Sequence, residues 1–234
     1  MRRLFLAIIV VTMVLGLLVA SCGPAKPKAY KVGFINHLTG DAAAYGQSMK
    51  KGAELALDEI NAAGGINGVP VEVIFEDDRL SGPDALTAFF KLVDTDKVPV
   101  VMGSGSSTVT LAVCPKSNER KIVQITSIST NPKLKECGEY FFGAMPLDDT
   151  QGREWSNVAK KLGVNEAAVM YINNDYGTGV KDVFVADFQA KGGKILIAQP
   201  FEVGGSDFRT EILKVKETNP KVVFIVGHYR EGSL

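Results

Sequence analysis

Short apolar runs alternate with amphipathic stretches along most of the chain after residue 30. The run Lys31–Asn36 (KVGFIN) predicts a buried β-strand, whereas Tyr45–Ala62 places apolar residues at helical spacing and predicts an α-helix. Strands that alternate with long helices indicate βαβ units and an α/β fold with parallel sheets. The predicted strands are 31–36, 69–76, 98–102, 122–125, 167–172, 194–201 and 222–226, and the predicted helices are 45–62, 83–94, 108–119, 150–162, 179–191 and 208–218.

The alternation is interrupted once, between residues 131 and 149, where proline and glycine lie among short apolar pieces. We interpret this stretch as a crossover between two doubly wound α/β lobes, an N-terminal lobe at 30–148 and a second lobe at 149–234. Ligands of such sheets bind beyond the carboxyl ends of the strands. Two lobes can direct both sets of strand ends toward one cleft, which is where small-molecule sites concentrate.

The N-terminal residues have the layout of an export signal. MRR provides a positive start, Leu4–Val19 is apolar, and VASC follows at residues 19–22. This junction resembles a bacterial lipobox, so residues 1–21 are predicted to be a signal peptide. Cys22 is then predicted to carry lipid, with 22–29 as a stalk. A retained anchor helix, a twin-arginine signal and a plain signal with an accidental cysteine remain alternatives.

The charge and cysteine content restrict the possible partners. Lys plus Arg and Asp plus Glu both number 26, so no basic surplus exists for nucleic acid, and none is expected as a partner. Apart from Cys22, the cysteines are Cys114 and Cys137, which lack metal-ligand spacing and a nearby histidine. Outside the cytoplasm they can form a disulfide, but the sequence leaves open whether they do. No metal site is expected.

Polar and aromatic residues follow the predicted strands. The stretch GSGSST at residues 103–108 follows the strand predicted at 98–102. It lacks the lysine of a phosphate-binding loop, the third glycine of a dinucleotide fingerprint and the spacing of a nucleophile elbow. What remains is backbone N–H groups, hydroxyls and the start of a helix, which suit a small anion such as a carboxylate. Ser106 or Ser107 can also be only a helix cap, and because a cap and an anion contact are compatible, both interpretations are kept.

Three other residues at strand ends have two interpretations each. Thr130 either stabilises the turn before Pro132 or contacts a ligand. Tyr45 and Tyr176 both precede a glycine near a helix start. Each tyrosine either packs against its neighbours or forms the wall of a cleft.

The two histidines and one acidic pair are weaker candidates. His37 and His228 lie at strand ends, without a metal-ligand motif or an acidic partner at suitable spacing. Catalysis by Ser107 with either histidine is therefore not expected. Asp77-Asp78 could hold a cation, but a solvated or capping pair is the simpler interpretation.

Several segments together resemble the branched-chain amino-acid-type periplasmic binding proteins, the type 1 solute-binding components of ABC importers. They occur in family order and cover nearly all of residues 30–232. The first segment is highly characteristic of the family, whereas each short segment taken alone is only a weak indication of it. The segments are GFINHLTGDAAAYGQSMKKGAELALDEINAAGGINGVPVEVIFEDD, GSGSSTVTLAV, STNPKLKECGEYFF, the stretch Pro146–Gly152, NNDYGTG, GSDFRTEI and NPKVVFIVGHYREG.

The resemblance implies roles for individual residues of the first lobe. Ser107 matches the serine that holds the α-carboxylate of the ligand, with Gly105 and Ser106 beside it. Ile128 matches a residue whose backbone carbonyl meets the α-ammonium group. Thr130 matches the threonine that bonds both main-chain groups of the ligand.

The resemblance to this family also implies that aromatic residues contact the ligand. Tyr45 and Tyr176 match aromatic cleft residues of the two lobes. His228 stands where the family often has a tyrosine, with Tyr229 next to it, so the contact from the second lobe departs from the family pattern. Family members also run on roughly half as far again beyond Leu234. We therefore expect an incomplete second lobe and a stability below that of a longer relative.

The function implied is that of an extracytoplasmic substrate-binding protein, periplasmic or at the cell surface and attached to the membrane by its lipid. It would capture an amino acid or related small carboxylate and deliver it to an ABC permease in the membrane, without cofactor and without catalysis. The alternative is a ligand-sensing module of the same fold that signals to a receptor or regulator. A hydrolase that uses Ser107 is not expected.

Overall fold

The structure is a computed structural model that describes residues 28–234. The predicted signal peptide and the lipid attachment at Cys22 lie outside the described residues. Within the described range, no helix has both the length and the apolar character that crossing a membrane requires.

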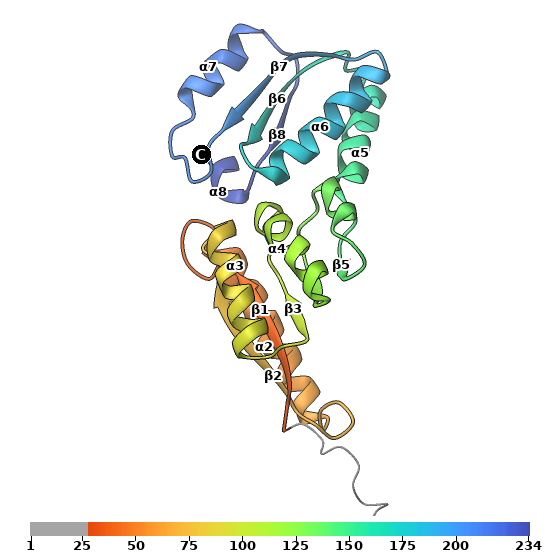
Figure 1. Cartoon of the computed structure of the whole chain (residues 1–234). Helices are drawn as coiled ribbons and strands as arrows, with labels where there is room; N and C mark the ends of the chain where they lie inside the picture. The colour runs from red at the N-terminus through yellow and green to blue at the C-terminus, as the bar shows by residue number, and fades with distance from the viewer. Residues whose placement is uncertain (1–27) are drawn as a thin grey trace, which may run out of the picture.

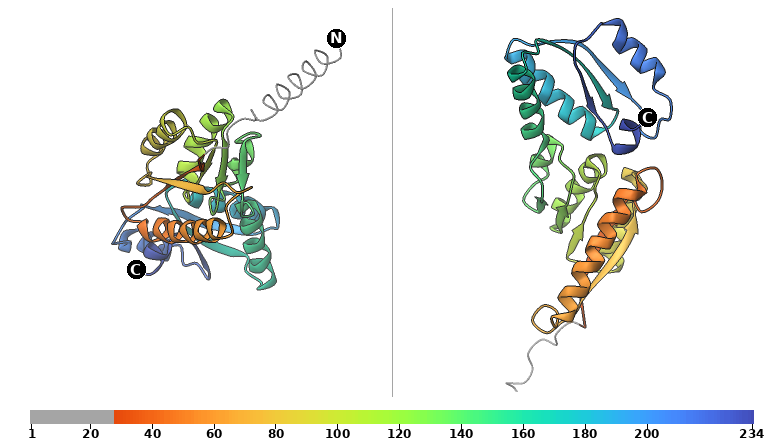
Figure 2. Two further views of the ribbon diagram at one scale, coloured as in Figure 1. Left: turned by 90° about the horizontal axis from the view of Figure 1, so that it is seen from below. Right: turned by 180° about the vertical axis from the view of Figure 1, so that it is seen from behind.

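The first part of the chain, which we call the first lobe, is built on a five-stranded parallel sheet of order β2-β1-β3-β4-β5. Helices α3 and α4 cover one face of this sheet, and α2 lies on the other (Figures 1 and 2). The core under α3 and α4 includes Ile35, Phe89, Leu92 and Val101, all almost fully buried. The elements are β1 (Tyr30–Asn36), α2 (Ala43–Ala62), β2 (Val71–Asp77), α3 (Gly82–Phe90), η1 (Lys91–Thr95), β3 (Val100–Met102), α4 (Ser107–Arg120), β4 (Val123–Thr126), η2 (Pro132–Glu136) and β5 (Phe141–Gly143).

The second lobe is built on a three-stranded parallel sheet of order β7-β6-β8. Helices α5 and α6 pack together on one face over Phe184 and Phe188, and α7 packs on the other over Phe201 and Val215 (Figure 1). The elements are α5 (Asp148–Lys161), β6 (Glu166–Ile172), α6 (Asp175–Ala190), β7 (Lys194–Phe201), α7 (Arg209–Glu217), β8 (Val223–Val226) and α8 (Tyr229–Gly232).

The predicted α/β fold with parallel sheets is confirmed, because every strand pair within these two sheets is parallel. The predicted crossover at 131–149 is more ordered than expected, since it contains the 3-10 helix η2 and strand β5. Strand β5 is only 3 residues long and too short for a periodic pattern. Its order comes from pairing with β4.

Helix α6 begins four residues before the predicted start at residue 179, because Asn174 caps it. The Asn174 side chain accepts a hydrogen bond from the Gly177 amide at 2.9 Å. A Cβ at Gly177 would lie 2.0 Å from the Ile172 carbonyl oxygen, so glycine allows the first turn to approach β6 closely. The tight start brings Tyr176 to the carboxyl end of the strand.

Cys114 and Cys137 form a disulfide bond in this structure, with their Cα atoms 5.4 Å apart. Both residues are buried together with Leu134. The bond attaches the segment after η2 to helix α4. It therefore stiffens the chain that leaves the first sheet toward the second lobe.

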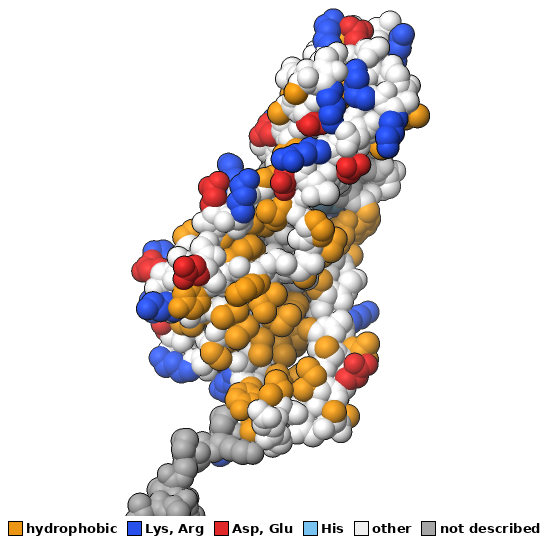
Figure 3. Space-filling model, turned by 90° about the vertical axis from the view of Figure 1, so that its right-hand side faces the viewer, with side chains coloured by type: hydrophobic (Ala, Val, Ile, Leu, Met, Phe, Trp, Pro, Cys, Tyr) orange, Lys and Arg blue, Asp and Glu red, His pale blue; other side chains and the backbone are white. Residues whose placement is uncertain are grey.

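One face of the first lobe carries hydrophobic side chains that are not fully buried. Met102, Ile125 and Phe142 are aligned across β3, β4 and β5, and Phe142 is 54% exposed. Ile128 and Met145 nearby are also exposed. Figure 3 shows hydrophobic side chains gathered on this side of the lobe.

Candidate functional site

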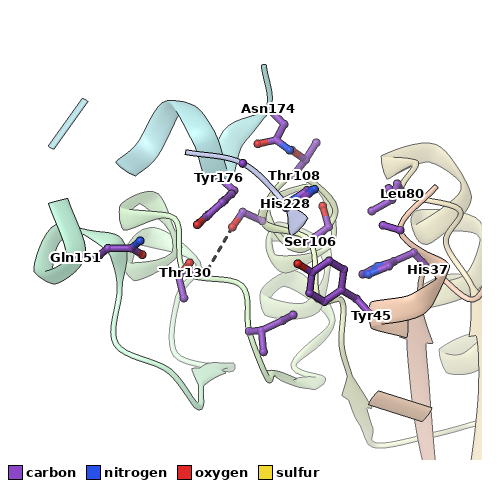
Figure 4. A pocket seen from close by; sticks show the side chains of 15 residues that line it. His37, Tyr45, Leu80, Ser106, Thr108, Thr130, Gln151, Asn174, Tyr176 and His228 are labelled. Carbon is purple, nitrogen blue, oxygen red and sulfur yellow. Dashed lines mark hydrogen bonds between the residues drawn. The ribbon is translucent and has the colours of Figure 1, made fainter. Parts of the chain in front are cut away.

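A cavity of about 220 Å³ lies between the two lobes and contains every predicted ligand-contacting residue in its lining. Ligand pockets for drug-sized molecules span about 300–1,000 Å³, so this cavity suits a smaller molecule. Figure 4 shows side chains from both lobes converging on it. The eight predicted residues are Tyr45, Gly105, Ser106, Ser107, Ile128, Thr130, Tyr176 and His228.

Seven further lining residues were not expected in the site. The sequence places His37 at a strand end and predicts no ligand contact for it. Thr108 is the last residue of GSGSST, Asn174 lies in NNDYGTG, and Gln151 lies in the segment 146–152. Their positions next to predicted site residues could therefore have indicated that they line the cavity. The additional residues are His37, Ala42, Leu80, Thr108, Gln151, Asn174 and Gly227.

A group of buried hydroxyls holds the loops after β3 and β4 together. The Ser104 carbonyl oxygen accepts hydrogen bonds from the hydroxyls of Thr126 at 2.7 Å, Ser129 at 2.8 Å and Thr110 at 3.2 Å. All four residues are almost fully buried. Because the carbonyl and hydroxyls satisfy one another, the two loops have little freedom, and the site residues they carry are held in place.

Ser107 occupies the junction of these loops, and its hydroxyl is oriented by two backbone amides. The side-chain oxygen accepts hydrogen bonds from the Thr130 and Asn131 amides, each at 3.3 Å. Ser107 is only 3% exposed. A hydroxyl has two acceptor positions and one donor proton. With both acceptor positions occupied, the hydroxyl can still act as a donor, and Ser107 lines the cavity.

The interpretation of these serines as simple helix caps is wrong. Ser106 occupies the N-cap position of α4, but its side chain makes no capping hydrogen bond. Ser107 is the first residue of the helix, and its hydroxyl binds the neighbouring loop instead. The first amides of α4, beside the cavity, are therefore not satisfied by a cap and favour a negatively charged group.

Thr130 binds an acidic residue, so its interpretation as a turn stabiliser is wrong. Its hydroxyl donates to the Asp148 carboxylate at 2.9 Å, and the Asp148 amide donates to the Thr130 carbonyl at 2.7 Å. Asn131 performs the local capping, since its side chain accepts from the Lys133 amide at 2.8 Å. Because the Thr130 proton points to Asp148, its oxygen is left as an acceptor beside the cavity.

Asp148 is a buried carboxyl at the start of α5, only 2% exposed. Burial, with a smaller contribution from the negative charge of Asp149, raises its pKa from 3.8 to about 6 against the opposing effect of the hydrogen bond from Thr130. Its ionised form places a negative charge directly behind the Thr130 hydroxyl. A cation bound to that hydroxyl would be stabilised by the charge.

We expect Asp148 to make the free energy of unfolding fall as the pH rises from about 4 to about 6. In this window the folded protein retains a proton that the unfolded chain has lost, so folding becomes less favourable with increasing pH. Asp148→Asn removes this titrating group. The free energy of unfolding of the variant, relative to that of the wild type, should therefore be roughly 1–2 kcal/mol higher at pH 7.5 than at pH 4.5. Urea denaturation at both pH values measures this. An identical difference between the two proteins at both pH values would contradict it.

The two predicted tyrosines pack against other rings and also line the cavity. Tyr176 stacks on His228 with ring centres 5.8 Å apart and an angle of 13° between planes. Tyr45 meets His228 edge-on at 5.9 Å and lies 5.1 Å from the ring of Tyr229. The two interpretations of these tyrosines are therefore compatible, because the packed rings form one wall of the cavity (Figure 4).

Polar contacts connect the lobes around the cavity. The Tyr229 amide donates to the Tyr45 hydroxyl at 3.4 Å, and the Asp175 amide donates to the Thr108 hydroxyl at 3.2 Å. Arg230 forms an ion pair with Asp41. The first residue of each pair lies in the second lobe and its partner in the first. The two lobes are thus in direct contact around the cavity.

Asp77 and Asp78 accept hydrogen bonds from backbone amides, as their interpretation as a capping pair predicts. Asp77 accepts hydrogen bonds from the Leu38 amide at 2.9 Å and the Arg79 amide at 3.0 Å. Asp78 accepts from the Leu80 amide at 2.9 Å. Among residues 28–234, no cluster of three or more His, Cys, Asp or Glu side chains is arranged to hold a metal ion.

Comparison with known proteins agrees with the two-lobed architecture. The sequence profile of the family described as periplasmic binding protein matches residues 29–228. The chain belongs to this family. The predicted resemblance to its branched-chain amino-acid type is confirmed by relatives such as Leu/Ile/Val-binding protein homolog 3 of Brucella melitensis. That protein is 31% identical over 205 residues, which cover 87% of this chain and 55% of the relative.

Other relatives are an amino acid binding protein of Pseudomonas aeruginosa and two solved structures. The Pseudomonas protein is 31% identical over 86% of this chain and 54% of its own. The isoleucine complex of LivJ from Streptococcus pneumoniae is 32% identical with a TM-score of 0.79, covering 87% of this chain and 58% of that one. The leucine binding protein LivK of Thermotoga maritima is 27% identical with a TM-score of 0.80, covering 87% and 57%. The chain spans about half the length of the curated relatives it matches.

Proposed function

We propose that this chain is part of an extracytoplasmic substrate-binding protein of an ABC importer, which captures an amino acid or a related small carboxylate between its lobes. The observation that carries the proposal is the Ser107 hydroxyl, which accepts hydrogen bonds from two amides and lines the cavity beside the uncapped start of α4. Relatives named as amino acid and Leu/Ile/Val-binding proteins support the same class of ligand.

The carboxylate of the ligand would bind to the Ser107 hydroxyl and to the first amides of α4. Hydrogen bonds to a charged acceptor are stronger than neutral ones, and the N-terminal end of a helix adds its positive dipole. The ammonium group would donate to the Thr130 hydroxyl oxygen and to the Ile128 carbonyl, two acceptors at the same cavity. The Asp148 carboxylate behind Thr130 would stabilise that positive charge.

The lining of the cavity disfavours a ligand whose side chain is charged. None of the lining residues is Lys, Arg, Asp or Glu. Burial lowers the pKa of His228, so its ring is mainly neutral at neutral pH. A zwitterion matches such a site because dipoles at separate positions meet its two charges, whereas a charged side chain would lose its hydration without compensation.

Closure would connect binding to transport. A ligand that contacts Ser107 in one lobe and Tyr176 in the other has more contacts in the closed form, and so it shifts the equilibrium toward closure. The contacts between Tyr45 and Tyr229 and between Asp41 and Arg230 would form at the same time. We propose that the permease recognises the closed form, that lipid on Cys22 keeps the protein at the membrane, and that the ligand is released unchanged.

Calorimetric titration of the full chain with the common amino acids tests the proposal. We expect at least one to bind, and expect Thr130→Val to weaken its binding about tenfold, since the isosteric valine removes the acceptor for the ammonium group. Thr87→Val is the matched control, because the Thr87 hydroxyl only donates to the Pro83 carbonyl within α3. Failure of every amino acid and small carboxylate to bind would refute the proposal.

A further inference from the structure

His37 is a buried polar side chain in the cavity with unused hydrogen-bonding capacity. It is 2% exposed, and its Nδ1 atom has no hydrogen-bond partner. Behind it lies Asp78, whose Oδ1 is 3.9 Å from Nδ1. Buried groups of this kind are normally paired, and an unpaired one is costly. A small movement of either side chain joins Nδ1 to Asp78, which leaves Nε2 for a group in the cavity.

The position of His37 separates it from the groups proposed to bind the main chain of the ligand. Figure 4 shows His37 and Leu80 on the opposite side of the cavity from Thr130 and Gln151. Ala42, another lining residue, belongs to the same loop after β1 as His37. A ligand held by its main-chain groups near Thr130 would therefore extend its side chain toward two apolar residues and one imidazole.

The imidazole is held in place and is uncharged at neutral pH. Burial and the nearby His228 together lower the pKa of His37 from 6.5 to about 4, against an opposing effect of Asp77. The Gly105 backbone closes against the ring, because a Cβ there would lie 3.1 Å from its Cε1 atom. A neutral imidazole offers one donor and one acceptor, but it cannot compensate a second negative charge.

We propose that His37 determines specificity, and that the ligand is an amino acid whose side chain carries an uncharged hydroxyl or amide group hydrogen-bonded to this imidazole. The inference rests on the proposed function of the cavity. A purely aliphatic side chain would leave a buried ring nitrogen unpaired, whereas a polar one satisfies it. Sites built to bond a polar group discriminate strongly against analogues that lack it.

Pairs of amino acids with nearly the same shape provide the test. The full chain is titrated with threonine against valine and with asparagine against leucine. In at least one pair we expect the polar member to bind at least about tenfold more tightly. In His37→Leu this preference should fall to about one or reverse, and in His37→Gln, which retains a donor and an acceptor, most of it should remain.

His228→Leu is the matched control, since it removes the other imidazole of the same cavity. It should weaken both members of a pair alike by loss of stacking on Tyr176, and leave their ratio unchanged. An equal or stronger affinity of the wild type for the apolar member of both pairs, or a preference unaltered by His37→Leu, would overturn the role of His37 while the proposed function survives. Failure of all amino acids to bind would overturn the proposed function, and this inference with it.

Discussion

Ser107→Ala is expected to lower the affinity for the bound amino acid about 100-fold, the largest effect we predict for any single contact in the cavity. The substitution removes the donor to the ligand carboxylate, and a hydrogen bond to a charged group contributes about 1.5–3 kcal/mol. It also removes the acceptor for the Thr130 and Asn131 amides. Those amides would then lack a buried partner, and the loop that carries Thr130 would lose an anchor.

Calorimetric titration of the wild type and variant with the same ligand measures the loss. Ser106→Ala makes the same chemical change one residue earlier, at a side chain that makes no capping bond. It should reduce affinity by at most about threefold, since a single weak contact contributes well under 1 kcal/mol. Equal losses in the two variants would argue against a specific role of the Ser107 hydroxyl.

Phe184→Ala is expected to lower the free energy of unfolding of the second lobe by about 3–5 kcal/mol, as is typical when a buried phenylalanine is truncated. Phe184 is fully buried between α6 and the sheet. Its ring lies 5.4 Å from that of Phe188 and 4.4 Å from that of Phe224. A sheet of only three strands has few other large residues to close the resulting cavity, so the loss should be near the upper end of the range.

The single tryptophan of the chain provides the measurement. Trp155 stacks on Phe224 with ring centres 5.9 Å apart, so its fluorescence reports on this core during urea denaturation. Leu162→Ala removes a comparable side chain that is 75% exposed, and it should change the stability by no more than about 0.5 kcal/mol. Similar midpoints for Phe184→Ala and Leu162→Ala would contradict the assigned core.

The candidate site could be predicted largely because its residues follow strands. The segments after β1, β3 and β4 are polar runs next to apolar ones, and the carboxyl ends of parallel strands meet at one edge of a sheet. The resemblance to a family added Ile128, which has no chemical signal of its own. His37 and Asp148 could not be assigned in this way, because their importance lies in burial and in an unsatisfied or charged partner. These properties depend on what packs against them.

The sequence by itself determined the α/β class and most element positions, and together with the family resemblance it predicted eight of the fifteen residues around the cavity. Periodicity and glycine placement act over a few neighbouring residues and need no knowledge of distant contacts. Only the tertiary structure decided that the Ser107 hydroxyl is oriented by Thr130 and Asn131, and that rings of both lobes stack at His228. Such contacts join residues far apart in the chain, and they form only after both sheets have folded and the lobes have come into contact.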